Sequence, residues 1–437
     1  MDFFALKANN TSVKQELSAG FTTFLAMMYI VPVNAIIMSK TGMPMDALIT
    51  ATALITIIAT ILNGLWANTP VAMSVGMGLN AYFTFGLVLD MKIPWQTALG
   101  VVFLSGVLFV VLSFTNFRVW VIKSIPLDLR RAISAGIGVF ISFIGLQQMG
   151  LIVNNEAVLV GLGDLKSENV LMGILGLLII LAFWVLKVKG ALILSVLITS
   201  LVAWIFGIAP YPTEFFSLPA SISPILFQFD ISGVFFDATG MFSLALVPVI
   251  IVFFVTDLFD SVGTLTGVGT RAGIFDDSDK KGVTKMEKTL EVDAIATLGG
   301  SIIGVSTTTS FAESASGVEA GGKTGLTAVF CGVLFIFTLF LLPFFKSIPA
   351  NAIYPVLVMV GVFMFSEISE INFKDPAVFI ATFFIIVMMP LTYSITNGLA
   401  FGFLSYILIR LFRREWSQIN LGVSTLAFIS LIVFIVH

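Results

Sequence analysis

The amino-acid sequence predicts an all-α polytopic membrane protein, with 14 spans arranged as two inverted repeats of seven. Of its 437 residues, 58% are hydrophobic and only 11% are charged, with a mean hydropathy of +1.07. Soluble domains carry about 25% charged residues. Apolar stretches of about 20 residues, the length that crosses a bilayer, recur from Leu17 to the C-terminus. The chain is therefore expected to be a bundle of spans.

The first repeat is expected to occupy residues 1–208 and the second residues 241–437. Residues 209–240, rich in Pro, Ser and Phe and without Lys or Arg, are expected to be an extracellular linker. A last apolar run, 421–436, is either a short extra span or an interfacial helix, and hydropathy does not decide between them. The expected spans are 17–38, 46–67, 71–89, 95–115, 129–150, 170–187 and 190–208 in the first repeat, and 241–268, 287–304, 305–320, 324–345, 349–366, 376–392 and 394–412 in the second.

The positions of Lys and Arg give an independent test of this arrangement, because cytoplasmic loops collect them. With the N-terminus in the cytoplasm, the spans leave only Lys40, Lys92, Lys166 and Lys346 of the 22 Lys and Arg residues outside. The start of the chain lacks the features of a signal peptide and is expected to be a mature cytoplasmic end. An odd number of spans per half inverts the second half relative to the first. We expect a multi-pass protein of the cell membrane.

Composition also excludes several functions. The net charge of -3 and the absence of a basic block interleaved with aromatic residues argue against nucleic-acid binding. Cys331 is the only cysteine and His437 the only histidine, so no His-based zinc site or catalytic triad can form within the chain. We expect no metal and no cofactor beyond a coupling ion. Any proton chemistry must use carboxylates.

Matching motifs support an inverted repeat, which is typical of secondary transporters. Ile-Pro pairs open spans five and twelve, at Ile125 and Ile348. A Gly-Val-Phe sequence follows at the same depth in each span, beginning at Gly138 and Gly361. The two halves are therefore expected to share one fold.

Spans three and ten are expected to be interrupted. The sequence from Asn68 and the sequence from Gly304 each start with Thr, Ser or Val and continue with Gly and small residues, which favour a continuous helix poorly. Non-helical backbone at membrane depth must be buried in protein or line a cavity. We therefore expect the two segments to pair strand against strand near the midplane, with half-helices after Val75 and Ser310 pointing their N-terminal dipoles at the cavity. The alternative is that they are small-residue faces for helix packing.

Carboxylates within spans are costly and are functional candidates. Glu313 begins the half-helix of span ten, while Asp257 and Asp260 lie one turn apart on one face of span eight. In a dry cavity such groups could bind protons near neutral pH. For Asp257 the alternative is a structural hydrogen bond to the span-ten backbone. Asp293 and Glu291 are weaker candidates, expected to pair with loop cations or water.

Polar and aromatic neighbours complete the candidate site. Asn80 can donate and accept hydrogen bonds at once, although it could equally bridge two helices. Phe311, Tyr82 and Phe83 are candidates to stack on a planar ligand. In a chain with 43 Phe residues, packing is the alternative for each.

At these residues the chain resembles the nucleobase transporters of the second nucleobase–cation symporter family, the nucleobase:ascorbate transporter superfamily, and specifically its AzgA-like branch of purine permeases. The resemblance extends over nearly the whole chain. Its most specific parts are residues 67–70 with 76–83, 257–265, 307–318 and 322–327.

The resemblance implies a core domain, approximately 17–115 and 241–345, that carries the substrate and moves against a gate domain, approximately 125–208 and 348–437. It also implies a possible homodimer formed through the gate domain. The substrate site that it implies consists of Asp260 and Glu313, which would hold the base, Phe311, which would stack on it, Asn80, and the adjacent Phe259, Ala312 and Ser310. Asp257 likewise matches a position that is important in the purine branch.

One position departs from the family pattern. The uracil-carrying branch has a proton-coupling His four residues after the span-eight carboxylate, and this chain has Thr264 there. The coupling proton is then expected on Asp257, Asp260 or Glu313, unless the coupling ion is not a proton.

The leading hypothesis is a proton-coupled purine symporter that imports adenine, guanine, hypoxanthine or a close relative by alternating access. The preferred purine is left open. One alternative is an anion exchanger or channel, since half-helix N-termini attract anions. It is disfavoured because three carboxylates would crowd that site without a Lys or Arg. A membrane enzyme is a second alternative, disfavoured because the chain has neither an internal His nor a nucleophile motif.

Overall fold

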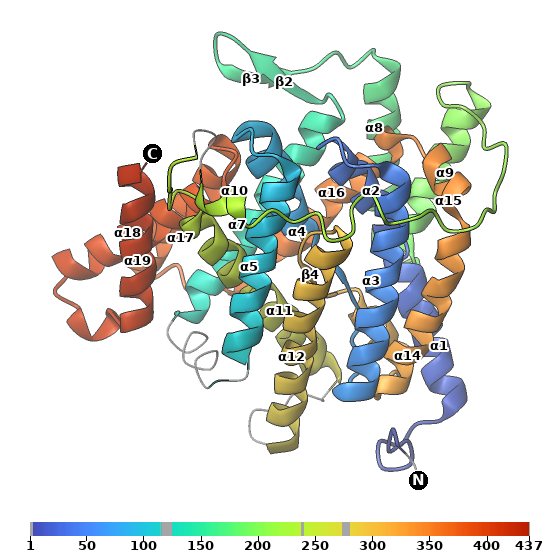
Figure 1. Ribbon diagram of the computed structural model, residues 1–437, viewed down its shortest axis with the longest axis horizontal. Helices are drawn as coiled ribbons and strands as arrows, with labels where there is room; N and C mark the ends of the chain where they lie inside the picture. The colour runs from blue at the N-terminus through green and yellow to red at the C-terminus, as the bar shows by residue number, and fades with distance from the viewer. Residues whose placement is uncertain (1–2, 114, 116–124, 237–239, 273–279, 437) are drawn as a thin grey trace.

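The structure is a computed structural model that describes all residues except 1–2, 114, 116–124, 237–239, 273–279 and 437. The only histidine, His437, and part of the expected linker therefore lie outside the described residues. The described chain is mostly helical, and its termini lie on different sides of the molecule (Figure 1).

The first half of the chain forms helices at the expected spans, with strand and short helix replacing a continuous third span. Loops between them begin and end within a few residues of the expected positions. In chain order the elements are α1 (Val13–Met27), α2 (Ile30–Ser39), α3 (Met45–Trp66), β1 (Met73–Val75), α4 (Met77–Ala81), the π-helix η1 (Tyr82–Asp90), α5 (Trp95–Ser113), α7 (Leu127–Gln148), β2 (Ile152–Asn155), β3 (Leu159–Leu162), α8 (Glu168–Val185) and α9 (Ala191–Ile205).

The second half repeats this pattern, and strand and short helix again replace a continuous span. Several helices start at residues that favour an N-terminus: Thr324 and Ser394 cap α14 and α18 with their side chains, and Pro376 follows the cap residue Asp375 of α17. The elements are α10 (Ser232–Phe235), α11 (Val247–Ala272), α12 (Lys280–Ile303), β4 (Thr308–Ser310), α13 (Ser314–Glu319), α14 (Gly325–Phe335), η2 (Ile336–Phe340), α15 (Leu342–Ser347), α16 (Ala350–Phe365), η3 (Ser366–Glu370), α17 (Pro376–Leu391), α18 (Ile395–Phe412), η4 (Trp416–Gln418) and α19 (Leu421–Val436).

Span one is not the single helix that the sequence predicts. Helix α1 ends at Met27 and α2 begins at Ile30, which leaves Met28 and Tyr29 between them. Pro32 explains this break, because its ring clashes with the carbonyl group four residues earlier and it has no N–H to donate. The break places Tyr29 in the protein interior, where it is 1% exposed.

A β-hairpin formed by β2 and β3 was not predicted. It projects from the molecule on the side opposite the N-terminus (Figure 1). Asn155 stabilises its turn by accepting hydrogen bonds from the backbone N–H groups of Ala157 and Val158. Four-residue strands with exposed side chains leave little hydrophobic periodicity in the sequence, so the hairpin gave no clear signal.

Within the described residues, eight helices are long and apolar enough to cross a bilayer, and three shorter apolar helices accompany them. The protein is thus a multi-pass membrane protein, while the count of 14 crossings stays a prediction. Residues 209–240, apart from α10 and the undescribed residues 237–239, run across the molecule from α9 to α10 (Figure 1). The run 421–436 is the helix α19, which packs against α18.

Helix packing divides the spans into two groups. Helices α1, α3, α5, α12 and α14 pack among themselves, and α7, α8, α16, α17 and α18 do the same. The division of the chain into a core domain and a gate domain stays a prediction. In the second group α7 packs on α16, where Gly138 and Gly361 face each other. These are the glycines of the two matching Gly-Val-Phe motifs.

We expect Gly361→Ala to destabilise the protein by about 1–3 kcal/mol, because the added methyl group has no room. A Cβ at this position would lie 2.2 Å from the carbonyl oxygen of Gly138. Thermal unfolding in detergent would measure the loss. Gly299→Ala is the matched control, since its Cβ would meet only Ile55 Cδ1, at 3.7 Å. Equal melting temperatures for the two variants would contradict this account of the α7–α16 contact.

Candidate functional site

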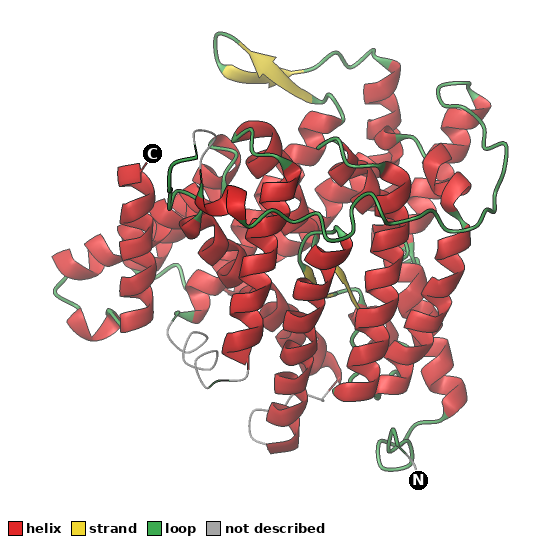
Figure 2. Cartoon of the chain, viewed as in Figure 1, coloured by secondary structure: helices red, strands yellow, loops and turns green. Residues whose placement is uncertain are grey.

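The two interrupted segments meet in a short antiparallel ladder. Strand β1 pairs with β4, with Met73 opposite Ser310 and Val75 opposite Thr308. Both strands are fully buried, and Figure 2 shows them among the helices. Because the strands come from opposite halves of the chain, the ladder joins the two halves, and the predicted pairing of the interrupted segments is confirmed.

Backbone hydrogen bonds extend the ladder beyond the strands. The N–H of Gly76 donates to the carbonyl of Thr307 at 2.9 Å, and the N–H of Phe311 donates to the carbonyl of Ala72 at 3.0 Å. The N–H of Ala72 donates to Ser314 Oγ at 3.0 Å. Each strand leads directly into a short helix, α4 or α13. The irregular backbone is therefore paired within the protein, as burial away from water requires.

A threonine side chain forms hydrogen bonds with the backbone groups on the outer edge of each strand. The N–H of Met73 donates to Thr60 Oγ1 at 3.0 Å, and this hydroxyl donates to the carbonyl of Met73 at 2.9 Å. In the other half, the N–H of Thr308 donates to Thr297 Oγ1 at 3.1 Å, and the hydroxyl lies 2.8 Å from the carbonyl of Thr308. Thr60 is on α3 and Thr297 on α12, so the threonines hold equivalent places in the two halves.

Glu313 lies directly before α13 and is half-buried. Its carboxylate Oε1 accepts a hydrogen bond of 2.5 Å from the hydroxyl of Tyr29, the residue at the break between α1 and α2. This contact joins residues 284 positions apart in the sequence. The bond therefore holds the carboxyl group of Glu313 against the break in span one.

Asp257 and Asp260 both lie on α11 but have different surroundings. Asp260 is half-buried, has no hydrogen-bond partner in the described part of the chain, and is near enough to Glu313 for their charges to interact. Asp257 is fully buried, and its Oδ2 lies 2.8 Å from Thr297 Oγ1. The contact of Asp257 with span ten is thus indirect, through Thr297, and not the direct backbone bond that the sequence alternative named.

Asp293 forms no ion pair with a cation in the described chain, which was one of the two kinds of partner expected for it. It lies on α12, is fully buried, and accepts a short hydrogen bond from Ser261 on α11. Ser261 also contacts the hydroxyl of Thr309 in β4 at 2.7 Å. The extension of α12 toward Lys280, beyond the expected start at residue 287, places Asp293 deep within a helix and away from the loops.

Asn80 bridges helices in this structure. It is fully buried, and its amide donates to Asn34 Oδ1 at 2.5 Å, while the amide of Asn34 donates to Thr52 Oγ1 at 2.8 Å. The oxygen Asn80 Oδ1 has no partner among the described residues. Asn80 is thus held by α2, with one acceptor unused.

The other predicted substrate contacts surround the end of β4. Phe311 and Phe259 are 5% and 6% exposed, whereas Ala312 is exposed. Ser310 is buried, and its hydroxyl has no partner within the residues described. Phe311, Ala312 and Glu313 follow one another directly after the strand, so β4 fixes the position of all three.

Tyr82 and Phe83 belong to the protein interior. Tyr82 stacks on Phe253 with ring centroids 5.5 Å apart, and its hydroxyl lies 2.8 Å from Thr396 Oγ1 on α18. Phe83 is fully buried. Tyr82 therefore connects η1 with α11 and α18, and of the three predicted aromatics only Phe311 adjoins Glu313 in the sequence.

Comparison with known proteins identifies the family. The family model described as "Permease family", that of the nucleobase:ascorbate transporters, matches residues 14–401. The chain belongs to this permease family. The match includes both interrupted segments and both carboxylate-bearing helices, and it confirms the resemblance drawn from the motifs.

Individual relatives match this permease over most of their length. The adenine permease AdeP of Escherichia coli (strain K12) is 40% identical over 408 residues, 93% of this chain and 89% of that protein. The guanine/hypoxanthine permease PbuO of Bacillus subtilis (strain 168) is 39% identical over 421 residues, 95% and 96% of the two chains. The solved transmembrane domain of the cyanobacterial bicarbonate transporter BicA has a TM-score of 0.62 at 14% identity, covering 87% of this chain and 95% of that one. This last likeness shows the fold.

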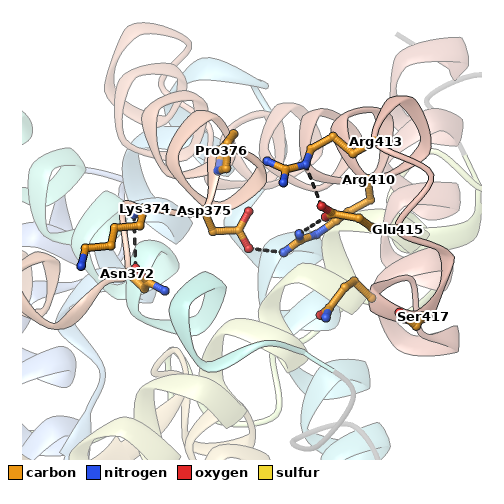
Figure 3. A pocket seen from close by; sticks show the side chains of 9 residues that line it. Asn372, Lys374, Asp375, Pro376, Arg410, Arg413, Glu415 and Ser417 are labelled. Carbon is orange, nitrogen blue, oxygen red and sulfur yellow. Dashed lines mark hydrogen bonds and ion pairs between the residues drawn. The ribbon is translucent and has the colours of Figure 1, made fainter.

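A cavity of about 440 Å³ lies away from the ladder of this permease, beside α17 and α18 (Figure 3). Arg410 donates hydrogen bonds to Asp375 and Glu415, and its bond to Glu415 holds the pKa of that carboxyl below its ordinary value. The cavity has no aromatic lining, so it does not suit a flat apolar guest. Its lining residues are Asn372, Lys374, Asp375, Pro376, Arg410, Arg413, Glu415, Ser417 and Gln418.

Three residues near the ladder were missed by sequence reasoning: Tyr29, Asn34 and Thr297. Each is a single polar side chain in an apolar span. The Pro32 helix break was the one available signal for Tyr29, and nothing comparable marks the other two. The described residues contain no group of three or more His, Cys, Asp and Glu that could hold a metal ion. The permease is not an enzyme.

Proposed function

We propose that this permease imports a purine nucleobase together with a proton by alternating access. One observation carries the proposal: the β1–β4 ladder places Phe311 and Glu313 directly after a buried strand, close to Asp260 on α11. The names of the relatives AdeP and PbuO, an adenine permease and a guanine/hypoxanthine permease, support the substrate class.

The chemistry of this group suits a purine. A purine has flat apolar faces and an edge that carries both donors and acceptors. The carboxylates of Glu313 and Asp260 accept from N–H groups, the Ser310 hydroxyl can donate to a ring nitrogen or carbonyl oxygen, and Phe311 can cover a face. Asp260 and Ser310 lack hydrogen-bond partners within the described residues, so both are free to bind a guest.

Alternating access requires the substrate-bearing helices to move against the rest. In the proposal, the core contains the ladder, α11 and the helices packed on them, and the gate contains α7, α8 and α16–α18. Tyr82 and Thr396 form one contact between these groups. The proposed homodimer would form through the gate, leaving the core free to move.

A proton is the proposed coupling ion because negative charge is concentrated near the ladder. Asp257, Asp260, Asp293 and Glu313 form no ion pair with any Lys or Arg in the described chain. Binding a proton reduces this charge and changes the hydrogen bonds that the group can make. The same absence of a basic partner disfavours the anion-exchange alternative.

Transport by purified protein in liposomes tests the proposal. We expect an inward proton gradient to drive accumulation of adenine, guanine or hypoxanthine, and a proton ionophore to abolish it. Parallel vesicles with a sodium gradient test the coupling ion. Accumulation of bicarbonate or sulfate, without accumulation of any purine, would reject the proposed substrate class.

A further inference from the structure

Thr297 makes three polar contacts at its hydroxyl, and two of them compete for its one hydrogen. The hydroxyl accepts from the N–H of Thr308, lies 2.8 Å from the carbonyl oxygen of Thr308, and lies 2.8 Å from Asp257 Oδ2. A threonine hydroxyl offers one hydrogen and two lone pairs. If its hydrogen goes to the carbonyl, the contact with Asp257 needs a hydrogen from the carboxyl group.

The first half of the chain shows which way this hydrogen points. Thr60 makes the same two bonds to Met73, accepting from its N–H and donating to its carbonyl oxygen, at 3.0 and 2.9 Å. No carboxylate contacts Thr60 among the described residues. The strand-edge arrangement thus uses the threonine hydrogen for the strand carbonyl, and the Asp257 contact is an addition to it.

Among the described residues, the charged groups that interact with Asp257 and its neighbours are carboxylates. Asp260 lies on the next turn of α11, Asp293 faces Asp257 from α12, and Glu313 lies beyond Asp260 before α13. Asp293 and Glu313 each accept a hydrogen bond from a hydroxyl, of Ser261 and Tyr29. Those two contacts suit an ionised carboxylate. The contact of Asp257 suits a protonated one when the hydrogen of Thr297 goes to the strand carbonyl, as that of Thr60 does.

Burial supports the same assignment. Asp257 is fully buried, and its Oδ1 lacks any partner in the described part of the chain. An unpaired oxygen on an ionised carboxylate costs far more in a dry interior than one on a neutral acid. A proton on Asp257 removes the charge and supplies the hydrogen that Thr297 can accept.

We infer that Asp257 carries the coupling proton and that Thr297 transmits its protonation state to strand β4. This inference rests on the proposed function and adds the position of the proton. When Asp257 loses its proton, the hydroxyl hydrogen of Thr297 turns to the carboxylate, and the carbonyl of Thr308 loses its donor. Strand β4 leads directly into Phe311 and Glu313, so proton binding and base binding become linked through the strand.

The first test is Asp257→Asn, which imitates the protonated acid because asparagine is neutral and can donate to Thr297. In wild-type protein, linkage to one proton changes purine affinity by about tenfold per pH unit where the group titrates. The variant is expected to bind purine with an affinity that pH does not change. It should exchange purine across the membrane but not accumulate it on a proton gradient.

The second test compares Thr297→Val with Thr60→Val. Each variant removes the same two bonds to a strand edge, and only the first removes a contact with a carboxylate. Thr297→Val is expected to lose the pH dependence of purine affinity, while Thr60→Val keeps it. A purely structural role for Thr297 would instead leave the pH profiles of the two variants alike.

Each outcome separates the inference from the proposed function. Proton-driven accumulation by Asp257→Asn would overturn the inference and leave the proposed function intact. Wild-type accumulation that follows sodium and not protons would reject the proton in both and leave a purine permease. Failure of wild-type protein to bind or carry any purine would reject both. If purine affinity loses its pH dependence in Asp257→Asn and in Thr297→Val but keeps it in Thr60→Val, the result would support the proposed linkage from the proton on Asp257 through Thr297 to strand β4.

Discussion

Glu313→Gln is expected to abolish concentrative purine uptake while the protein still inserts and folds. The carboxylate accepts from Tyr29 and is the proposed acceptor for an N–H of the base. A glutamine places an amide donor between two groups that also donate, the hydroxyl of Tyr29 and the N–H of the base. The loss of a charged acceptor is worth about 2–3 kcal/mol, a factor of about 30–100 in affinity. The effect should be on purine binding at every pH, which separates it from the effect of Asp257→Asn.

Binding of radiolabelled purine to purified protein measures this effect without transport. Glu319→Gln is the matched control, because Glu319 ends the same short helix and is exposed. It should bind purine as the wild type does. Wild-type affinity in Glu313→Gln, with correct folding, would remove Glu313 from the substrate site and leave Asp260 as the remaining carboxylate.

The broken spans were predictable because their cause is local. Gly, Ser, Thr and Val at the start of each segment disfavour a continuous helix, and unpaired backbone inside a membrane must find a partner. With an inverted arrangement of the halves, which stays a prediction, each strand has one obvious partner. The break in span one has an equally local cause, Pro32, but hydropathy alone does not register a kink. Where the apolar signal is weak, as in the β2–β3 hairpin or the first turns of α12, the expected bounds were wrong or absent.

The site was only partly predictable because its contacts are long-range. The carboxylates could be found, since a charge in an apolar span is conspicuous. The hydrogen-bond partners of these carboxylates could not be predicted. Tyr29 lies 284 positions from Glu313 in the sequence, and nothing in the sequence distinguishes Thr297 from other residues of span nine. The ion pair that was one of the two expectations for Asp293 is absent from the described chain for the same reason. A sequence reveals a buried charge, whereas its hydrogen-bond partners depend on the packing of several helices.

Another buried carboxylate, that of Glu16 on α1, has a structural role that the sequence did not suggest. It is fully buried, and its oxygens accept hydrogen bonds from the N–H groups of Lys323 and Thr324 at 3.1 and 3.2 Å. The hydroxyls of Thr324, Thr327 and Thr11 add bonds of 2.9, 2.6 and 2.8 Å. Glu16 thus ties the start of α1 to the start of α14 and holds residues of the 322–327 motif, which lies away from the ladder.

Glu16→Ala is expected to destabilise the protein by about 3–5 kcal/mol, because several buried donors lose a charged acceptor at once. The melting temperature in detergent should fall by about 3–5 °C. Glu168→Ala is the control, since Glu168 is an exposed carboxylate in the first turn of α8, and it should change the melting temperature little. If both variants melted like the wild type, Glu16 would not hold α1 against α14. If Glu16→Ala instead lost purine affinity at unchanged stability, Glu16 would belong to the site and not to the scaffold.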